Sequence, residues 1–129
     1  MDVLIRFGFS IEEIKNMMDS NTEINDVLDS SISEIINILE SVGCSKKNIR
    51  DIFNTNPFCL TRNVDEIKKL MAKLMDIGLL NINVLLDTNP FILNVDYKDI
   101  DSIYKKKVSE GLSPESITDF FYYESDKII

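Results

Sequence analysis

The sequence contains no histidine and no tryptophan, and alanine occurs once, at Ala72. Without histidine there is no imidazole base, no histidine metal ligand and no Ser-His or Cys-His nucleophile pair. The two cysteines, Cys44 and Cys59, are too few for a disulfide framework or, alone, for a closed zinc site. Adjacent acids such as Glu12 and Glu13 fit solvated charges at a helix start. We therefore expect a protein that is not an enzyme and that holds no cofactor and no metal.

Long apolar segments are also absent. No apolar run approaches 18 residues, so we expect no membrane-spanning helix and no membrane partner. The N-terminus lacks a basic region followed by a long apolar stretch and a small-residue cleavage site, which argues against a secretory signal. Both cysteines occupy apolar positions of the repeat described below and are expected to be buried free thiols. These features predict an intracellular protein, placed in the cytoplasm.

Glycine is scarce, and its four copies recur at one period. Gly8, Gly43, Gly78 and Gly111 are separated by 35, 35 and 33 residues. Such a period is typical of a tandem array of similar units. The length of 129 residues fits one domain. We expect a single helical-repeat domain over residues 1–129, with units near 8–42, 43–77, 78–110 and 111–129 after a partial helix at 1–7.

An apolar triplet follows each glycine, with the spacing i, i+3, i+4 that marks one face of a helix. The triplets are Ile14/Met17/Met18, Ile49/Ile52/Phe53, Ile82/Leu85/Leu86 and Ile117/Phe120/Phe121. A second amphipathic segment precedes Gly43 and Gly78. Glycine just beyond a helix can take the left-handed conformation without a Cβ clash, so each glycine is expected to end a helix.

Helix start signals recur within the units. The expected capping pairs are Ser10 with Glu13, Ser31 with Glu34, Ser45 with Asn48, Asn63 with Glu66 and Asp96 with Asp99, and Ser113 precedes Pro114. The expected helices span 10–20, 31–42, 45–54, 63–77, 82–88, 96–109 and 113–123. No segment alternates apolar and polar residues as a strand would. One unit cannot bury its apolar face alone, so stacking of neighbours predicts an all-α solenoid.

Residues 55–60 and 88–93 share the phrase Thr-Asn-Pro-Phe-x-Leu. Proline disfavours helical geometry at the preceding residue, so Asn56 and Asn89 should end the first helix of their units. The following Phe and Leu residues (Phe58, Leu60, Phe91 and Leu93) are expected to anchor a short turn or a single helical turn. The equivalent segment 21–24 lacks both Pro and Phe, and we expect it to be looser.

These phrases resemble the repeat of the mitochondrial transcription termination factor (mTERF) family. The glycine, the Asn-Pro-Phe-x-Leu turn and the longer helix match best over 42–60 and 77–93, with partial copies at 7–10 and 110–113. The resemblance implies a short, right- or left-handed helical-repeat solenoid of about three and a half units. It also implies binding of double-stranded nucleic acid along a basic concave groove, in transcription or its regulation. Other members of the family work with protein partners.

Charge is unevenly distributed along the chain, whose net charge is −8. Residues 1–45 contain nine acidic and two basic residues, whereas residues 46–73 contain seven basic and three acidic residues. If nucleic acid binds, the expected phosphate contacts within 46–73 are Lys46, Lys47, Arg50, Arg62, Lys69 and Lys73. The alternative is a solvated helix face with pairs such as Asp65 and Lys69. The acidic net charge favours that alternative, a protein-protein interaction module or small scaffold.

Two further features lie near the C-terminus. Lys105, Lys106 and Lys107 come late in an expected helix, where cations interact favourably with the helix dipole. Tyr122 and Tyr123 exceed what the repeat requires. They are expected either to cap the open end of the array or to contact a protein partner or a second copy of the chain.

Overall fold

The computed structural model describes residues 2–128, which form eight α-helices, four 3-10 helices and no strand. The elements are α1 (Asp2–Phe7), α2 (Ile11–Ser20), η1 (Thr22–Asp26), α3 (Asp29–Ser41), α4 (Lys46–Thr55), η2 (Pro57–Thr61), α5 (Val64–Asp76), α6 (Ile82–Thr88), η3 (Pro90–Asn94), α7 (Tyr97–Ser109), α8 (Pro114–Tyr123) and η4 (Ser125–Lys127). Each full unit is therefore a short α-helix, a 3-10 helix and a long α-helix. This is the all-α repeat solenoid that the sequence predicts.

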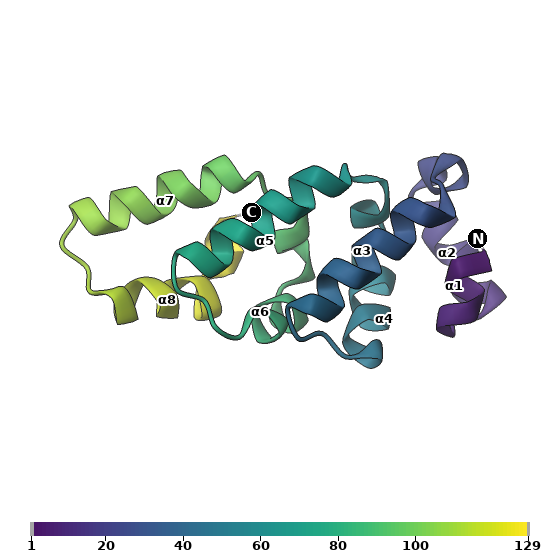
Figure 1. The fold of residues 1–129 in the computed structure, drawn as a ribbon, viewed down its shortest axis with the longest axis horizontal. Coiled ribbons are helices and arrows are strands. Elements are labelled where there is room, and N and C mark those ends of the chain that lie inside the picture. The colour runs from purple at the N-terminus through teal and green to yellow at the C-terminus, as the bar shows by residue number, and fades with distance from the viewer. Residues whose placement is uncertain (1, 129) are drawn as a thin grey trace.

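The units stack so that equivalent elements form rows (Figure 1). The long helices contact one another in the order α1, α3, α5, α7, and the short helices in the order α2, α4, α6, α8. The 3-10 helices η1, η2 and η3 form a third row. A surface site built from one row therefore draws on residues about 33 to 35 positions apart in the sequence.

The four glycines lie where long helices end, with φ between +83° and +113°. At every seam, the backbone N–H of the residue after the glycine donates to the carbonyl five residues earlier, over 3.0–3.2 Å. This is the hydrogen bond of the Schellman motif, which requires a left-handed residue that glycine supplies without a Cβ penalty. The predicted helix junctions at the glycines are confirmed.

Most predicted helix starts are also confirmed. Ser10 and Ser45 form reciprocal capping boxes with Glu13 and Asn48, and the side chains of Asn63, Asp96 and Ser113 also accept from backbone amides of the following turn. The prediction for Ser31 is wrong. Helix α3 starts at Asp29, with Leu28 as an N-cap that makes no side-chain bond. The backbone has already turned after η1 at Val27, so Ser31 lies inside the first turn.

The Thr-Asn-Pro-Phe segments form the 3-10 helices η2 and η3, but their phenylalanines do not anchor them. Phe58 and Phe91 are 53 % and 40 % exposed, whereas the residues that follow them, Cys59 and Ile92, are fully buried. In a 3-10 helix successive side chains point about 120° apart, so one of each apolar pair faces solvent. The first unit is not looser: η1 has the same five-residue length and fully buries Ile24.

One continuous hydrophobic core runs through all units. Of the apolar triplets, Met18 and Phe120 lie at its margin and are half-buried, while the other members are buried. Phe120 instead lies beneath the Lys107 ammonium, which is 3.8 Å from the ring centroid. The N-terminal halves of the units are joined by ring contacts, for example Phe9 with Phe53 of the next unit.

The residue that ends each short helix also links neighbouring units. Asn21 donates to Thr61 over 3.0 Å, and Asn89 donates to Ser125 over 3.1 Å. Asn56 is fully buried and makes three such bonds, to the carbonyl of Pro90 and, in both directions, to the side chain of Asn94, all of 3.1 Å. This asparagine ladder satisfies polar groups inside the stack, which would otherwise destabilise it.

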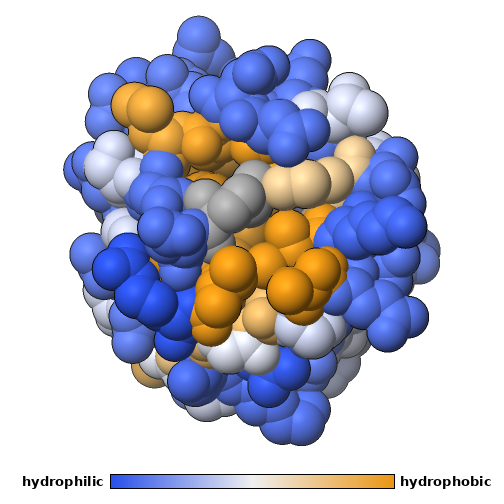
Figure 2. Space-filling view, turned by 90° about the vertical axis from the view of Figure 1, so that its right-hand side faces the viewer, coloured by the Kyte–Doolittle hydropathy of each residue, from blue (hydrophilic) through white to orange (hydrophobic). Residues whose placement is uncertain are grey.

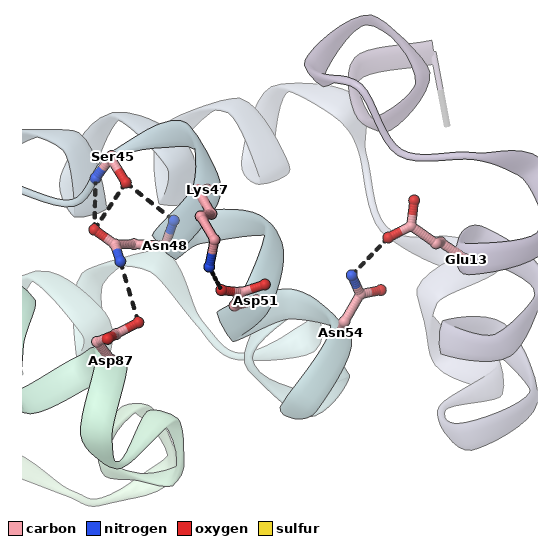
Figure 3. A network of polar contacts seen from close by, with 7 residues as sticks. All are labelled: Glu13, Ser45, Lys47, Asn48, Asp51, Asn54 and Asp87. Atoms are coloured by element: carbon pink, nitrogen blue, oxygen red, sulfur yellow. Dashed lines mark hydrogen bonds and ion pairs between the residues drawn. The ribbon is translucent and has the colours of Figure 1, made fainter.

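A second ladder joins the short helices (Figure 3). The equivalent contacts are Glu13 to Asn54 at 2.7 Å, Asn48 to Asp87 at 3.1 Å and the Asn81 N–H to the Tyr122 hydroxyl at 2.9 Å. At each junction the first residue lies on the earlier unit and the second on the later one. Every unit therefore presents one face to its predecessor and a different face to its successor.

Candidate functional site

The basic residues of segment 46–73 do not form one patch. Lys46, Lys47 and Arg50 lie on α4, in the row of short helices, whereas Lys69 and Lys73 lie on α5, in the row of long helices. Sequence proximity alone suggested a single site, but the turn at η2 sends the chain from one row to the other. The structure thus offers two separate basic clusters.

The cluster on α4 is tied up with neighbouring groups. The Lys47 ammonium lies 2.8 Å from the carboxylate of Asp51 (Figure 3). Arg50 reaches the Glu13 carboxylate at 3.3 Å, and Lys46 lies over the ring of Phe7 at 5.4 Å from its centroid. These contacts connect α4 to the preceding unit, which gives the cluster a structural role in the stack.

Arg62 belongs to neither cluster. Its guanidinium donates to the backbone carbonyl of Leu93 in the next unit. Burial lowers the pKa of Arg62 from its usual value, while Glu66 and Asp96 act against that shift. A carbonyl bond from a partly desolvated guanidinium stabilises the junction between η2 and η3, so this side chain is committed to holding units together.

The second cluster surrounds a groove of about 420 Å³ between α5 and α7. Tyr97 lies at one wall, and two ammonium groups flank its ring: Lys69 at 5.7 Å and Lys98 at 6.0 Å from the centroid. Lys73 lines the same groove. We call Lys69, Lys73, Tyr97 and Lys98 the α5–α7 cluster. Cations beside an aromatic face are the side chains that a phosphate backbone and its bases contact.

Ion pairs within the α5–α7 cluster set its charge. Lys73 contacts Asp101 at 3.2 Å and Asp76 at 3.6 Å, and the hydrogen bond to Asp101 raises the pKa of Lys73. Lys69 is more weakly held, 3.8 Å from Glu66. Exposed pairs of this kind stabilise by about 0–1 kcal/mol. A polyanion can therefore compete for Lys69 at low energetic cost, and less easily for Lys73.

The two C-terminal tyrosines have different environments. The Tyr122 hydroxyl accepts the backbone N–H of Asn81, so this side chain continues the ladder between short helices. Tyr123 is exposed and lies beside Tyr122, with ring centroids 6.4 Å apart. It lines a groove of about 440 Å³ that also includes Phe91. Of the two residues, Tyr123 is the one available to a partner.

Sequence reasoning missed two surface features. Lys98 lies outside the basic segment in the sequence, yet stacking of α7 on α5 places it beside Tyr97 and near Lys69. The exposed Phe58 and Phe91 recur 33 residues apart on η2 and η3, which contact each other. The repeated Pro-Phe dipeptide was visible, but hydrophobicity alone assigned its phenylalanine to the core.

The remaining chemistry of the described part of the chain is limited. Within residues 2–128, no group of three or more Cys, Asp or Glu residues could hold a metal ion. Burial raises the pKa of Cys44 to about 11 and that of Cys59 to about 12, so neither thiol ionises readily. Every helix in the same range is too short or too polar to cross a bilayer.

Comparison with known proteins identifies a family but no individual relative. The family model described as mTERF matches residues 1–126, which is nearly the whole chain. No curated protein and no solved structure matches the sequence.

Proposed function

Because the chain belongs to the mTERF family, we propose that it is a non-enzymatic helical-repeat module that binds double-stranded nucleic acid, in transcription or its regulation. The proposal rests on family membership together with one surface feature, the α5–α7 cluster. There, Lys69 and Lys98 flank Tyr97 along a groove between two long helices.

The α5–α7 cluster is the better of the two basic clusters for phosphate contact. The Lys69 and Lys98 side chains lie on the exposed surface, and neither spans to the preceding unit through a short ion pair. On α4, by contrast, Lys47 and Arg50 are held by carboxylates at 2.8 Å and 3.3 Å. Breaking those pairs would subtract from any gain on phosphate binding.

The acidic character of the chain limits the footprint. Residues 1–45 carry nine acidic residues against two basic ones, so a long duplex aligned with the whole solenoid would meet repulsion. We infer a short contact confined to the second and third units. Each neutralised phosphate contributes about −0.9 to the slope of log affinity against log salt, so a few contacts give binding that is strongly salt-dependent.

The test is a titration of labelled duplex DNA and duplex RNA, followed by fluorescence anisotropy at about 50 mM and about 200 mM salt. Binding at the lower salt that weakens steeply at the higher salt is expected. Undetectable binding of both duplexes at the lower salt would reject the proposed function.

Two double variants with equal charge changes locate the contact. Lys69→Glu with Lys98→Glu alters the α5–α7 cluster, and Lys46→Glu with Lys47→Glu alters α4 by the same four charges. We expect the first variant to lose binding and the second to retain most of it. The opposite pattern would move the site to α4, and equal losses would mean that net charge, not a site, governs binding.

A protein-interaction module is the second candidate function, favoured by the exposed Phe58, Phe91 and Tyr123. Exposed aromatic side chains in grooves are typical anchors of protein interfaces. This function predicts that Phe58→Ser and Phe91→Ser leave nucleic-acid binding unchanged while weakening a protein complex recovered from the native cell. If both substitutions abolish duplex binding instead, the aromatic residues belong to the nucleic-acid site.

A further inference from the structure

The two ends of the solenoid expose the faces that units use to contact each other inside the stack. We call the predecessor-facing surface of the first unit the head face, and the successor-facing surface of the last unit the tail face. Inside the chain these two kinds of surface always meet, for example where Glu13 contacts Asn54 and where Asn48 contacts Asp87. At the ends, each face lacks its counterpart within residues 2–128.

The head face is apolar at its centre. Lys46, at the start of α4, covers the preceding unit, and its equivalent on α2 is Ile11, which is 79 % exposed. Ile5 of α1 is 52 % exposed. Viewed from the end where α1 and α2 lie, the molecule shows a group of hydrophobic side chains surrounded by hydrophilic ones (Figure 2). Large exposed apolar surfaces of this kind mark interaction sites.

The tail face is open in a complementary way. A Cβ added to Gly8, Gly43 or Gly78 would meet a side chain of the next unit within 4 Å, whereas one added to Gly111 would meet nothing. Leu112, which follows Gly111, is 38 % exposed. Its equivalents in the other units, Phe9, Cys44 and Leu79, are 3 %, 6 % and 2 % exposed because the next unit covers them.

Lysines surround the tail face. In the groove between α5 and α7, the α5 wall is formed by Lys69, Ala72, Lys73 and Asp76, which therefore face the next unit. The residues 33 positions later on α7 are Ser102, Lys105, Lys106 and Ser109. Two positive charges thus lie on the side of α7 that a following unit would contact.

The opposite sign prevails at the head. The segment 1–45 carries nine acidic residues, and Asp2 and Asp19 are exposed on α1 and α2. Asp19 is the equivalent of Asn54, which contacts the preceding unit, so it lies on the head face. Opposite charges around two apolar surfaces favour one orientation of approach and disfavour others.

We propose that a second copy of this chain stacks its tail face on the head face and so continues the solenoid across the molecular boundary. The contact repeats the geometry of the internal junctions and pairs the α7 lysines with the acidic head. A head-to-head contact would bring acidic surfaces together. The interface is heterologous, so each copy keeps one free face after pairing and assembly grows with concentration.

The experiment measures molecular mass by sedimentation and light scattering from about 1 μM to about 1 mM chain. Mass should rise with concentration, and it should rise less at high salt, because the lysine–acid attraction is screened. A chain that stays monomeric over the whole range overturns the proposal, whether or not another partner covers the head face.

Two variants at exposed positions test the orientation without disturbing the core. Ile11→Asp damages the head face, and Lys105→Glu with Lys106→Glu reverses the charge of the tail face. Each variant alone should associate at least about tenfold more weakly than the unaltered chain. Leu80→Asp serves as the control, because Leu80 is a highly exposed apolar residue in the loop between α5 and α6, and it should associate normally.

Mixing the two variants gives the decisive readout. The head variant still has an intact tail, and the tail variant still has an intact head, so an equimolar mixture should form a one-to-one dimer and grow no further. A tail variant that self-associates normally alone would indicate a head-to-head dimer and overturn the proposal. A mixture that stays monomeric while the unaltered chain associates would overturn it as well.

Discussion

The asparagine ladder gives a graded prediction for stability. Asn21, Asn56 and Asn89 occupy the same position in successive units, but they make different numbers of bonds to the next unit. Asn56 makes three, whereas Asn21 and Asn89 make one each. Replacement by leucine keeps the number of side-chain heavy atoms and removes the hydrogen bonds, so the three variants compare polar contacts at nearly constant volume.

The expected magnitude follows from the bond count. A protein hydrogen bond contributes about 0.5–1.5 kcal/mol net, and an unsatisfied buried partner adds to the cost. Asn94 is exposed and can bond to water in the variant, which reduces the penalty. We therefore expect Asn56→Leu to lower the free energy of unfolding by about 2–3 kcal/mol, and Asn89→Leu by about 1 kcal/mol.

Urea and thermal unfolding, followed by circular dichroism, measure these differences. For a chain of this size, about 1 kcal/mol corresponds to a change in Tm of about 4 °C. Asn56→Leu should therefore lower the Tm by about 8–12 °C, roughly twice the effect of Asn89→Leu or more. Equal effects of the two substitutions, or a more stable Asn56→Leu variant, would refute the reasoning that inter-unit hydrogen bonds at this position stabilise the stack.

Three further predictions concern the seams, the pH response and the thiols. Gly43→Ala should destabilise by about 1–3 kcal/mol through its left-handed backbone, and by more than Gly111→Ala, because only the new Cβ at Gly43 meets a neighbouring unit; chemical unfolding compares the two. The pKa of Glu13 is lowered from 4.5 to about 2 by the Ser10 backbone amide and then by Asn54, so its contribution to stability is full above pH 4.5 and is lost as the pH falls towards 2; Glu13→Gln should flatten stability curves in that window, and an unchanged curve would contradict this. Buried Cys44 and Cys59 should resist a thiol reagent at pH 8 until urea unfolds the chain; fast labelling of the native protein would refute it.

Local signals predicted the helices and their junctions. Ser10 with Glu13 and Ser45 with Asn48 are capping pairs that depend on neighbouring backbone alone, and both form in the structure. The same pattern at Ser31 failed, because the preceding 3-10 helix ends early enough for α3 to start at Asp29. A capping sequence predicts a helix start correctly only when the chain enters the helix at that residue.

The orientation of apolar residues in the turns was less predictable. Phe58 and Cys59 are both apolar, and sequence gives no periodicity over so short a segment to tell which faces the core. The structure buries Cys59 and exposes Phe58. The candidate site shows the same limit, since Lys69 and Lys98 belong to segments of opposite net charge and meet beside Tyr97 only through stacking of α7 on α5.

The amino-acid sequence by itself determined the repeat, its glycine seams and most helix boundaries, because these depend on periodicity and on backbone preferences of nearby residues. The tertiary structure alone decided which charges share a surface and which are used inside the stack. Arg62 donates to the Leu93 carbonyl and Tyr122 accepts from Asn81, each in a different unit. Such contacts depend on how units 33 to 41 residues apart pack together, which no local pattern encodes.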